Sequence, residues 1–229
     1  KPISVNQQNE HKETLEQYTA FLRKKTYILS KSFNEQDEKK LLSSINLDML
    51  TKTTETKPKQ IARAANQDKI LEEIAKLREN LAENRFLQSK SYEVFFVQAE
   101  KIPNILHEIG RLREITFREI GEGTNESIDL DKFDRYYYHM FLWDEDQQRV
   151  AGAYRMGLGS EIFPKYGIDG FYMQELFKFE PELHKMMSES IEMGRAFIVP
   201  DYQLKPMPLF LLWKGIVHTT LRYPQHKFL

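Results

Sequence analysis

Hydrophobic positions in the second half of the chain follow the period of a strand in some stretches and the period of a helix in others. Residues 92–97 (YEVFFV) are aromatic and β-branched, which predicts a buried strand. Further stretches complete the pattern, and we expect a helix at residues 102–120, hairpin strands at 140–143 and 150–158, a short helix at 181–189, a strand at 191–199 and a helix at 206–221. This order is typical of an α/β (α+β) domain in which helices flank a mixed sheet.

The first part of the chain has only helical periodicity. One hydrophobic stripe begins at Leu15, and a second runs from Ile70 to Leu81 with glutamate and lysine around it. The second stripe suits either a helix packed on its own domain or a short seam with a partner helix. All 10 glycines of the chain lie after this part. We therefore predict a helical segment with a polar linker at residues 1–90 and an α/β domain at residues 91–229.

Composition excludes several kinds of site. The chain has 33 Lys and Arg residues against 34 Asp and Glu residues, so no overall positive charge attracts it to nucleic acid. The absence of cysteine excludes a disulfide framework, a zinc site built on thiolates and a cysteine nucleophile. The 6 histidines are scattered without the spacing of metal ligands. We therefore expect no metal site and no nucleic-acid partner.

The chain carries no sequence signal for a membrane span, because no apolar run reaches the roughly 18 to 20 residues that a span needs. It begins with Lys1 and shows no charged and then apolar leader, as expected for a fragment or a processed product. The lack of cysteine suits a reducing compartment. We therefore expect a cytoplasmic protein whose membrane contact, if it has one, is peripheral and at the inner face.

Four motifs of charged and aromatic residues follow one another in the second module. They are Arg113-x3-Phe117, Asp131-x2-Asp134, Gly152-x-Tyr154-Arg155 and Glu192-x2-Arg195. This set resembles the positions shared by acyl-homoserine-lactone synthases. The longer stretches GAYR, EMGRAFIVPDYQ and LLWKGI are similar to ornithine-acyl-carrier-protein N-acyltransferases, often called haemolysin-like. The resemblance covers residues 92–229 and implies a GNAT-like fold and an N-acyltransferase.

The resemblance also bears on the acyl donor. Residues 202–208 (YQLKPMP) lack the glycine-rich loop that holds the pyrophosphate of coenzyme A in acetyl-CoA-dependent relatives. This favours acyl carrier protein over acyl-CoA as the co-substrate, with Lys205 placed to pair with its single phosphate. We assign Phe197 and Val199 to the same donor site and expect no other cofactor.

Two further similarities concern the ends of the chain. The family usually continues past residues 222–229, so we expect its closing strands to be absent here. Residues 1–3 and 18–29 resemble, over a short stretch, the tail of a glycerophosphate-type acyltransferase domain. This similarity implies that the chain was cut from a longer acyltransferase.

Aminolysis of a thioester needs a base that takes the proton of the amine and donors for the developing oxyanion. Glu192 is the candidate base and Arg195 its catalytic neighbour; alternatively, the two form a structural salt bridge. Residues three apart on a regular strand point to opposite faces, so both can serve one site only if the strand bulges. Gly194 between them permits a bulge.

The remaining candidate residues are assigned to the acceptor, an amino acid. They are Arg113, Phe117, Asp131, Asp134 and Arg155. An arginine fork would hold the carboxylate of the acceptor and an aspartate its ammonium. Alternatively, the charged residues form a paired cluster that ties the first helix and its loop to the sheet. We favour this structural role for the two aspartates and a binding role for Arg155.

A set of aromatic residues either walls an acyl tunnel or is plain core: Phe117, Phe133, Tyr154, Phe171, Tyr172, Phe197 and Trp213. The predicted reaction moves a fatty or 3-hydroxy-fatty acyl group from acyl carrier protein to the α-amine of an amino acid. Such a reaction belongs to the biosynthesis of ornithine- or glycine-type aminolipids. Two alternatives stay open, namely an acyl-homoserine-lactone synthase and a binding scaffold without catalysis.

Overall fold

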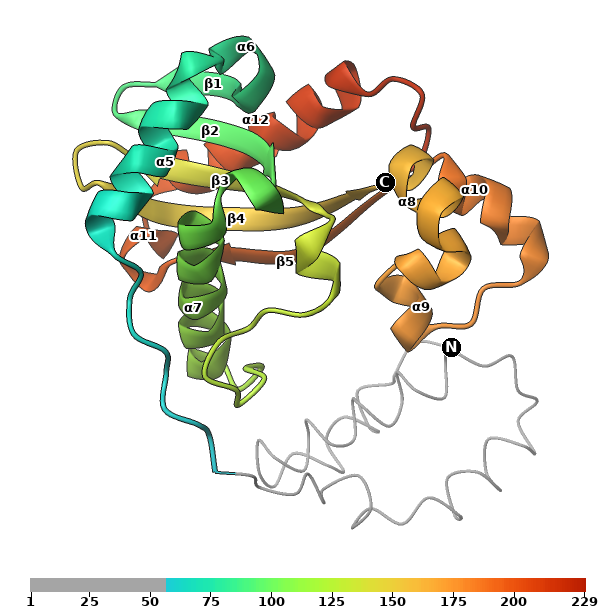
Figure 1. The fold of residues 1–229 in the computed structure, drawn as a ribbon, viewed down its shortest axis with the longest axis horizontal. Coiled ribbons are helices and arrows are strands. Elements are labelled where there is room, and N and C mark those ends of the chain that lie inside the picture. The colour runs from blue at the N-terminus through green and yellow to red at the C-terminus, as the bar shows by residue number, and fades with distance from the viewer. Residues whose placement is uncertain (1–56) are drawn as a thin grey trace, which may run out of the picture. The chain divides into compact units, whose positions relative to one another are not determined.

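A five-stranded sheet forms the centre of residues 57–229, the part of the chain that the computed structural model describes (Figure 1). The strands are β1 (Arg85–Ser89), β2 (Tyr92–Gln98), β3 (Tyr138–Asp144), β4 (Arg149–Leu158) and β5 (Ile191–Ile198). Their spatial order is β1-β2-β3-β4-β5, and each strand pairs antiparallel with the next. The expected α/β fold, with helices flanking one sheet, is confirmed, but these five strands form an antiparallel sheet and not a mixed one.

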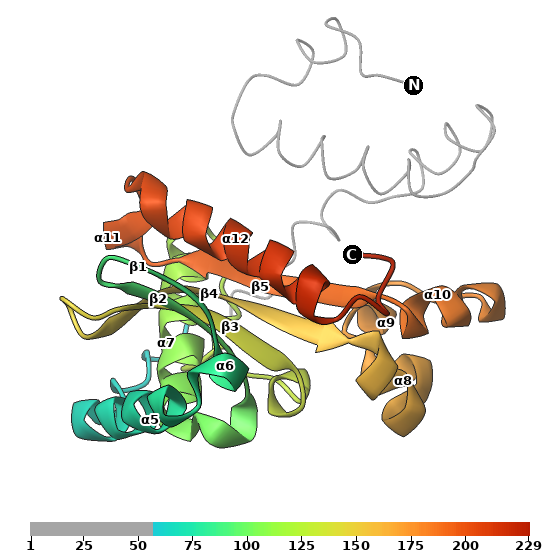
Figure 2. The ribbon, with the colours of Figure 1, turned by 90° about the horizontal axis from the view of Figure 1, so that it is seen from above.

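Helices cover both faces of this sheet. Helices α5 (Gln67–Glu79) and α7 (Pro103–Glu119) lie on one face, and α12 (Pro206–Arg222) lies on the other (Figures 1 and 2). The short elements are α6 (Leu81–Asn84), η1 (Ala99–Lys101), η2 (Phe133–Arg135), α8 (Gly159–Tyr166), η3 (Gly167–Gly170), α9 (Met173–Leu176), η4 (Pro181–Leu183), α10 (His184–Ser188) and α11 (Pro200–Gln203). The segment from α8 to α10 lies at the end of the sheet where β4 finishes and β5 begins (Figure 2).

Because helices cover both faces of the sheet, β2 can be a continuous apolar run. A strand that is buried on both faces does not alternate between apolar and polar residues. All four residues from Val94 to Val97 are accordingly buried, and the rings of Phe95 and Phe141 stack with their centres 5.2 Å apart. The core of the domain therefore extends through the sheet from α7 to α12.

Helix α12 is apolar on two sides. Leu211, Leu212 and Thr219 are buried against the sheet, whereas Trp213 and Val217 are exposed on the outer side. Within residues 57–229, no helix combines the length and hydropathy that a transmembrane segment requires.

The structure also decides the alternatives for the first part of the chain. The stripe that begins at Ile70 forms α5, and Ile70, Ile74 and Leu77 are buried in the core, so this helix packs on its own domain. The expectation of helices only up to residue 90 is wrong for Arg85–Ser89, which is the edge strand β1. Helix α5 and strand β1 belong to the compact unit Pro58–Leu229.

Other expectations concern residues outside the described range. The stripe at Leu15 and the similarity to a glycerophosphate-type acyltransferase both fall on residues 1–56. A separate module before Pro58 therefore stays a prediction.

Candidate functional site

Strand β5 bulges near its middle. The pairing of β4 with β5 shifts between Ala153 and Arg155, and here two residues of β5, Arg195 and Ala196, lie opposite Tyr154 alone. Arg195 has a φ of 51°, in the left-handed region that residues other than glycine seldom adopt. The bulge expected from the sequence is therefore confirmed, although the arginine, not the neighbouring glycine, takes the unusual conformation.

The bulge lets Glu192 and Arg195 contact the same residue, Tyr172, which precedes α9. Glu192 accepts a hydrogen bond of 3.1 Å from the backbone N–H of Tyr172, and the guanidinium of Arg195 lies 5.1 Å from the centre of its ring. Within the described part of the chain, Glu192 and Arg195 form no ion pair with each other, so the salt-bridge alternative does not hold.

Glu192 is held by three donors. Its Oε2 accepts from the hydroxyl of Tyr137 and from Tyr172 N–H, and its Oε1 accepts from Met173 N–H at 2.7 Å. Gly157 of β4 lies opposite Glu192, and a Cβ at Gly157 would come within 2.6 Å of the Tyr137 ring. The lack of a side chain at Gly157 thus lets Tyr137 reach the carboxylate. Burial, and then the nearby Glu192, raise the pKa of Tyr137 far above its usual range, so its hydroxyl stays protonated and donates.

Three arginines and three aspartates form a charged cluster between α7, the loop that follows it and the last two strands. The members are Arg113, Arg155, Arg195, Asp129, Asp131 and Asp134. Asp134 lies at the centre, because it accepts bonds from Arg113 Nη1 (3.1 Å) and Nη2 (3.0 Å), Arg155 Nη1 (3.1 Å) and Asp131 N–H (2.8 Å). Burial disfavours its charged form, but Arg113 and Arg155 outweigh this effect and hold the pKa of Asp134 at about 2.

The surroundings of Arg155 agree with the alternative in which the charged residues form a structural, paired cluster. Its side chain is 1% exposed, and its Nη1 donates to Asp131 Oδ1 at 2.6 Å as well as to Asp134. Its guanidinium also lies 5.1 to 5.6 Å from the ring centres of three aromatic residues, Phe133, Tyr137 and Tyr172. Arg195 is more open, with a side chain that is 25% exposed.

The candidate residues for the acyl donor occupy different environments. Phe197 and Val199 are buried in the core. Lys205 is exposed at the start of α12, with its Nζ 4.3 Å from the centre of the Tyr202 ring. Helix α12 opens with Pro206, so its first turn offers fewer N–H donors than a phosphate site normally uses.

The aromatic residues proposed for a tunnel do not share one surface. Phe133 and Phe171 are buried in a second, smaller cluster of core residues, whereas Trp213 is 64% exposed on the outer side of α12. Phe117, the aromatic residue assigned to the acceptor, is partly buried on α7 against the main core. The core alternative therefore accounts for Phe133, Phe171 and Phe197.

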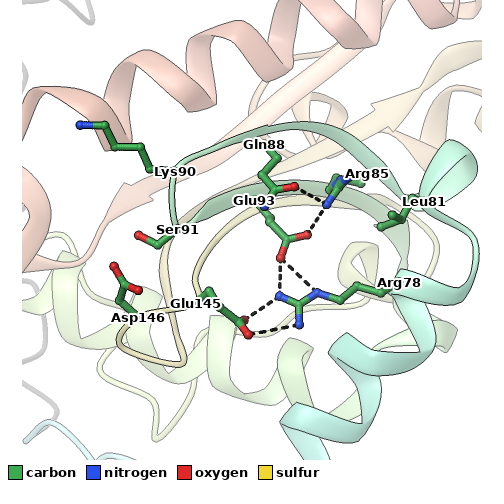
Figure 3. A pocket seen from close by; sticks show the side chains of 9 residues that line it. All are labelled: Arg78, Leu81, Arg85, Gln88, Lys90, Ser91, Glu93, Glu145 and Asp146. Atoms are coloured by element: carbon green, nitrogen blue, oxygen red, sulfur yellow. Dashed lines mark hydrogen bonds and ion pairs between the residues drawn. The ribbon is translucent and has the colours of Figure 1, made fainter.

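A hollow of about 530 Å³ lies at the opposite edge of the sheet, near β1 and β2 (Figure 3). Four of its charged side chains, Arg78, Arg85, Glu93 and Glu145, pair with one another, whereas Lys90 and Asp146 lie outside this network. Arg78 bridges the buried Glu93 and the exposed Glu145, and Arg85 donates to the other oxygen of Glu93 at 2.8 Å. This network ties α5 to the sheet, and its donors and acceptors are occupied, so we do not assign the chemistry to this hollow.

Two residues of the site, Asp129 and Tyr137, were not found from the sequence, and Tyr172 was named only as an aromatic residue of a tunnel or core. Asp129 precedes the Asp131 motif by two positions in an acidic loop, which is the one local signal for it. The contacts of the two tyrosines with Glu192 join residues 55 and 20 positions apart, and no local pattern encodes them.

Residues 112–213 match the family model of the acetyltransferase (GNAT) domain. The matched region runs from α7 through β3, β4 and β5 into α12, and it contains every member of the charged cluster. The match covers less than half of the chain, and this region is similar in sequence and fold to acetyltransferase domains of the GNAT type.

Two curated relatives both carry the name glycine N(alpha)-acyltransferase. The protein from Phocaeicola vulgatus is 31% identical over 155 residues, which are 63% of this chain and 48% of the relative. The protein from Bacteroides thetaiotaomicron is 29% identical over 177 residues, which are 70% of this chain and 52% of the relative. The chain thus spans about half the length of the curated relatives it matches. No solved structure matches it.

Proposed function

We propose that this domain acylates the α-amine of a small amino acid, with a fatty or 3-hydroxy-fatty acyl thioester as donor. The observation that supports this most directly is the bulge of β5, which places the carboxylate of Glu192 and the guanidinium of Arg195 on one side of the sheet. Glycine is the first acceptor to test, because both relatives are named for it. Ornithine is the second, from the resemblance of the motifs.

In the proposed reaction, the nitrogen of the neutral amine attacks the carbonyl carbon of the thioester. The new C–N bond forms, the C–S bond breaks, and the leaving thiolate takes up a proton. The attacking nitrogen loses its proton to Glu192, directly or through water. One oxygen, Oε1, accepts a single bond from the described residues and so keeps a further acceptor position for that proton.

We propose acyl carrier protein as the donor. The start of α12 supports this, since Pro206 and Pro208 lack N–H groups that a pyrophosphate would need, while the exposed Lys205 suits a single phosphate. We place the reaction in the cytoplasm, at the inner face of the membrane where an aminolipid product would enter the bilayer.

The test is a transfer assay with the full-length chain, with the same acyl group on acyl carrier protein and on coenzyme A, and with product detected by mass spectrometry. We expect a much higher kcat/KM for acyl carrier protein, and product with glycine or ornithine. Equal kcat/KM values for the two donors would contradict the proposed donor.

The role of Glu192 is tested in the same assay with Glu192→Gln. Loss of a positioned base should lower kcat by about 10² to 10⁴. A variant that melts early but keeps its activity per folded molecule would show instead that Glu192 only holds Tyr172 and Met173 in place.

A further inference from the structure

The three arginines of the charged cluster differ in how their donors are used. The side chains of Arg113 and Arg155 are each 1% exposed and donate to aspartates. The guanidinium of Arg195 makes no hydrogen bond to any residue in the described range. Its Nε lies 3.4 Å from Asp129 Oδ1 without hydrogen-bond geometry, and its Nη2 lies 3.9 Å from Asp131 Oδ2, beyond hydrogen-bond length. The Nε of Arg195 is buried, but its two Nη groups carry donors that no residue in the described range uses and that are available for a ligand.

The two carboxylate oxygens of Asp131 have different hydrogen-bond partners. Its Oδ1 accepts from Arg155 Nη1 and from the backbone N–H groups of Phe133 (2.8 Å) and Asp134 (3.2 Å). Its Oδ2 accepts no hydrogen bond from residues 57–229, and the side chain is 27% exposed. One oxygen is thus fixed in the framework, and the other is available beside Arg195.

Open space lies at Gly194, the residue before Arg195 in the chain. Gly194 pairs with Arg155 across the strands, and a Cβ built at Gly194 would meet no atom within 4 Å. On the neighbouring strand, a Cβ at Gly157 would come within 2.6 Å of a tyrosine ring. The bulge therefore leaves room for a small molecule at β5 that the packed part of β4 does not have.

We propose that Arg195 and Asp131 recognise the acceptor, with Arg195 binding its carboxylate and Asp131 Oδ2 binding its ammonium in the space beside Gly194. The two charges of an α-amino acid are separated by a single carbon, so the groups that bind them must be neighbours, as these are. A guanidinium grips a carboxylate through two parallel bonds, and the ring of Tyr172 against Arg195 restricts its orientation. The left-handed backbone of Arg195 fits this role, because strained residues concentrate at binding sites. This assignment rests on the proposed function.

The experiment compares glycine with glycinamide, which keeps the amine but lacks the negative charge, in the transfer assay with the full-length chain. Wild type should favour glycine in kcat/KM by about 10- to 100-fold, the usual effect of one charged hydrogen-bonded contact. Arg195→Lys keeps the charge near Asp129 but removes the planar fork, so it should raise the KM for glycine and remove most of this preference, with the donor KM unchanged.

Two more variants separate binding from folding. Gly194→Ala adds a methyl group that meets no protein atom, so it should raise the acceptor KM while the melting temperature stays unchanged. Arg149→Lys makes the matched substitution in β4, where the arginine pairs with the exposed Asp201, and should leave both KM values as they are. An Arg195→Lys enzyme that keeps the wild-type preference for glycine would overturn the assignment.

Failure of the proposed function would look different. If no acyl transfer occurs with either donor and any amine, the proposed function is wrong, and calorimetry of glycine with the donor-free protein decides the binding site by itself. Weaker binding of glycine by Arg195→Lys than by wild type supports the site. Equal binding by the two proteins, or no binding by wild type, overturns it.

Discussion

The substitution Asp134→Asn should destabilise the domain more than any other isosteric change in the charged cluster. Asp134 Oδ1 accepts from Arg113, and its Oδ2 accepts from Arg113, Arg155 and the N–H of Asp131. An asparagine side chain fits the same volume, but in either orientation its NH₂ group faces at least one of these donors. The two buried guanidinium groups also lose the negative charge between them.

The size of the expected loss of stability follows from the burial of Asp134 and its two arginine partners. The side chains of Asp134, Arg113 and Arg155 are each 1% exposed, and removing one partner from such a group typically costs about 3–5 kcal/mol. The pKa of Asp134, at about 2 against an ordinary 3.8, corresponds independently to about 2–3 kcal/mol. For a domain of this size we therefore expect a drop in melting temperature of about 6–20 °C.

The assay is urea and thermal unfolding of wild type and Asp134→Asn, followed by circular dichroism, with Asp146→Asn in the exposed β3–β4 turn as control. Because the folded pKa of Asp134 is lowered, its stabilisation is complete above pH 3.8 and is lost as the pH falls toward 2. The difference between wild type and variant should therefore shrink below pH 3.8. A loss under about 1 kcal/mol at neutral pH, within the range of exposed ion pairs, would refute the reasoning.

Further predictions concern neighbouring residues. Arg155→Lys should lower the free energy of unfolding by roughly 1–3 kcal/mol and leave the KM values of donor and acceptor in their wild-type ratio. A rise in the acceptor KM alone would show that Arg155 binds the acceptor. Complete burial lowers the pKa of His139 from 6.5 to about 4, although Asp134 opposes this shift. Wild type should therefore lose up to about 3 kcal/mol of stability as the pH falls from 6.5 to 4. His139→Gln should abolish that loss in pH-dependent melts. Gly159→Ala should cost about 1–3 kcal/mol in urea unfolding, since a Cβ would lie 2.2 Å from the carbonyl oxygen of Met187; unchanged stability would mean that this backbone yields freely.

Local pattern determined most of the fold. The apolar run of β2, the helical spacing of α7 and the prolines that begin α12 each act within one element, so the sequence alone predicted these elements near their observed bounds. Two places lacked such a signal. Strand β1 is a half-buried edge strand without a clear alternation, and α8 contains Pro164 in its interior, which argues against a helix.

The sequence also marked most of the charged residues of the site, because their motifs resemble a family, but it could not assign their partners. Whether an arginine is a framework residue or a binding residue depends on which carboxylates reach it. Those carboxylates come from a loop that lies 16 to 24 positions from Arg113 and Arg155 in the chain. The sequence favoured Arg155 for the acceptor, whereas packing closes Arg155 in and leaves Arg195 open. Gly194 indicated a bulge in the sequence, but the position of Arg195 in the bulge and its approach to the acidic loop depend on how β5 pairs with β4, and only the tertiary structure decides them.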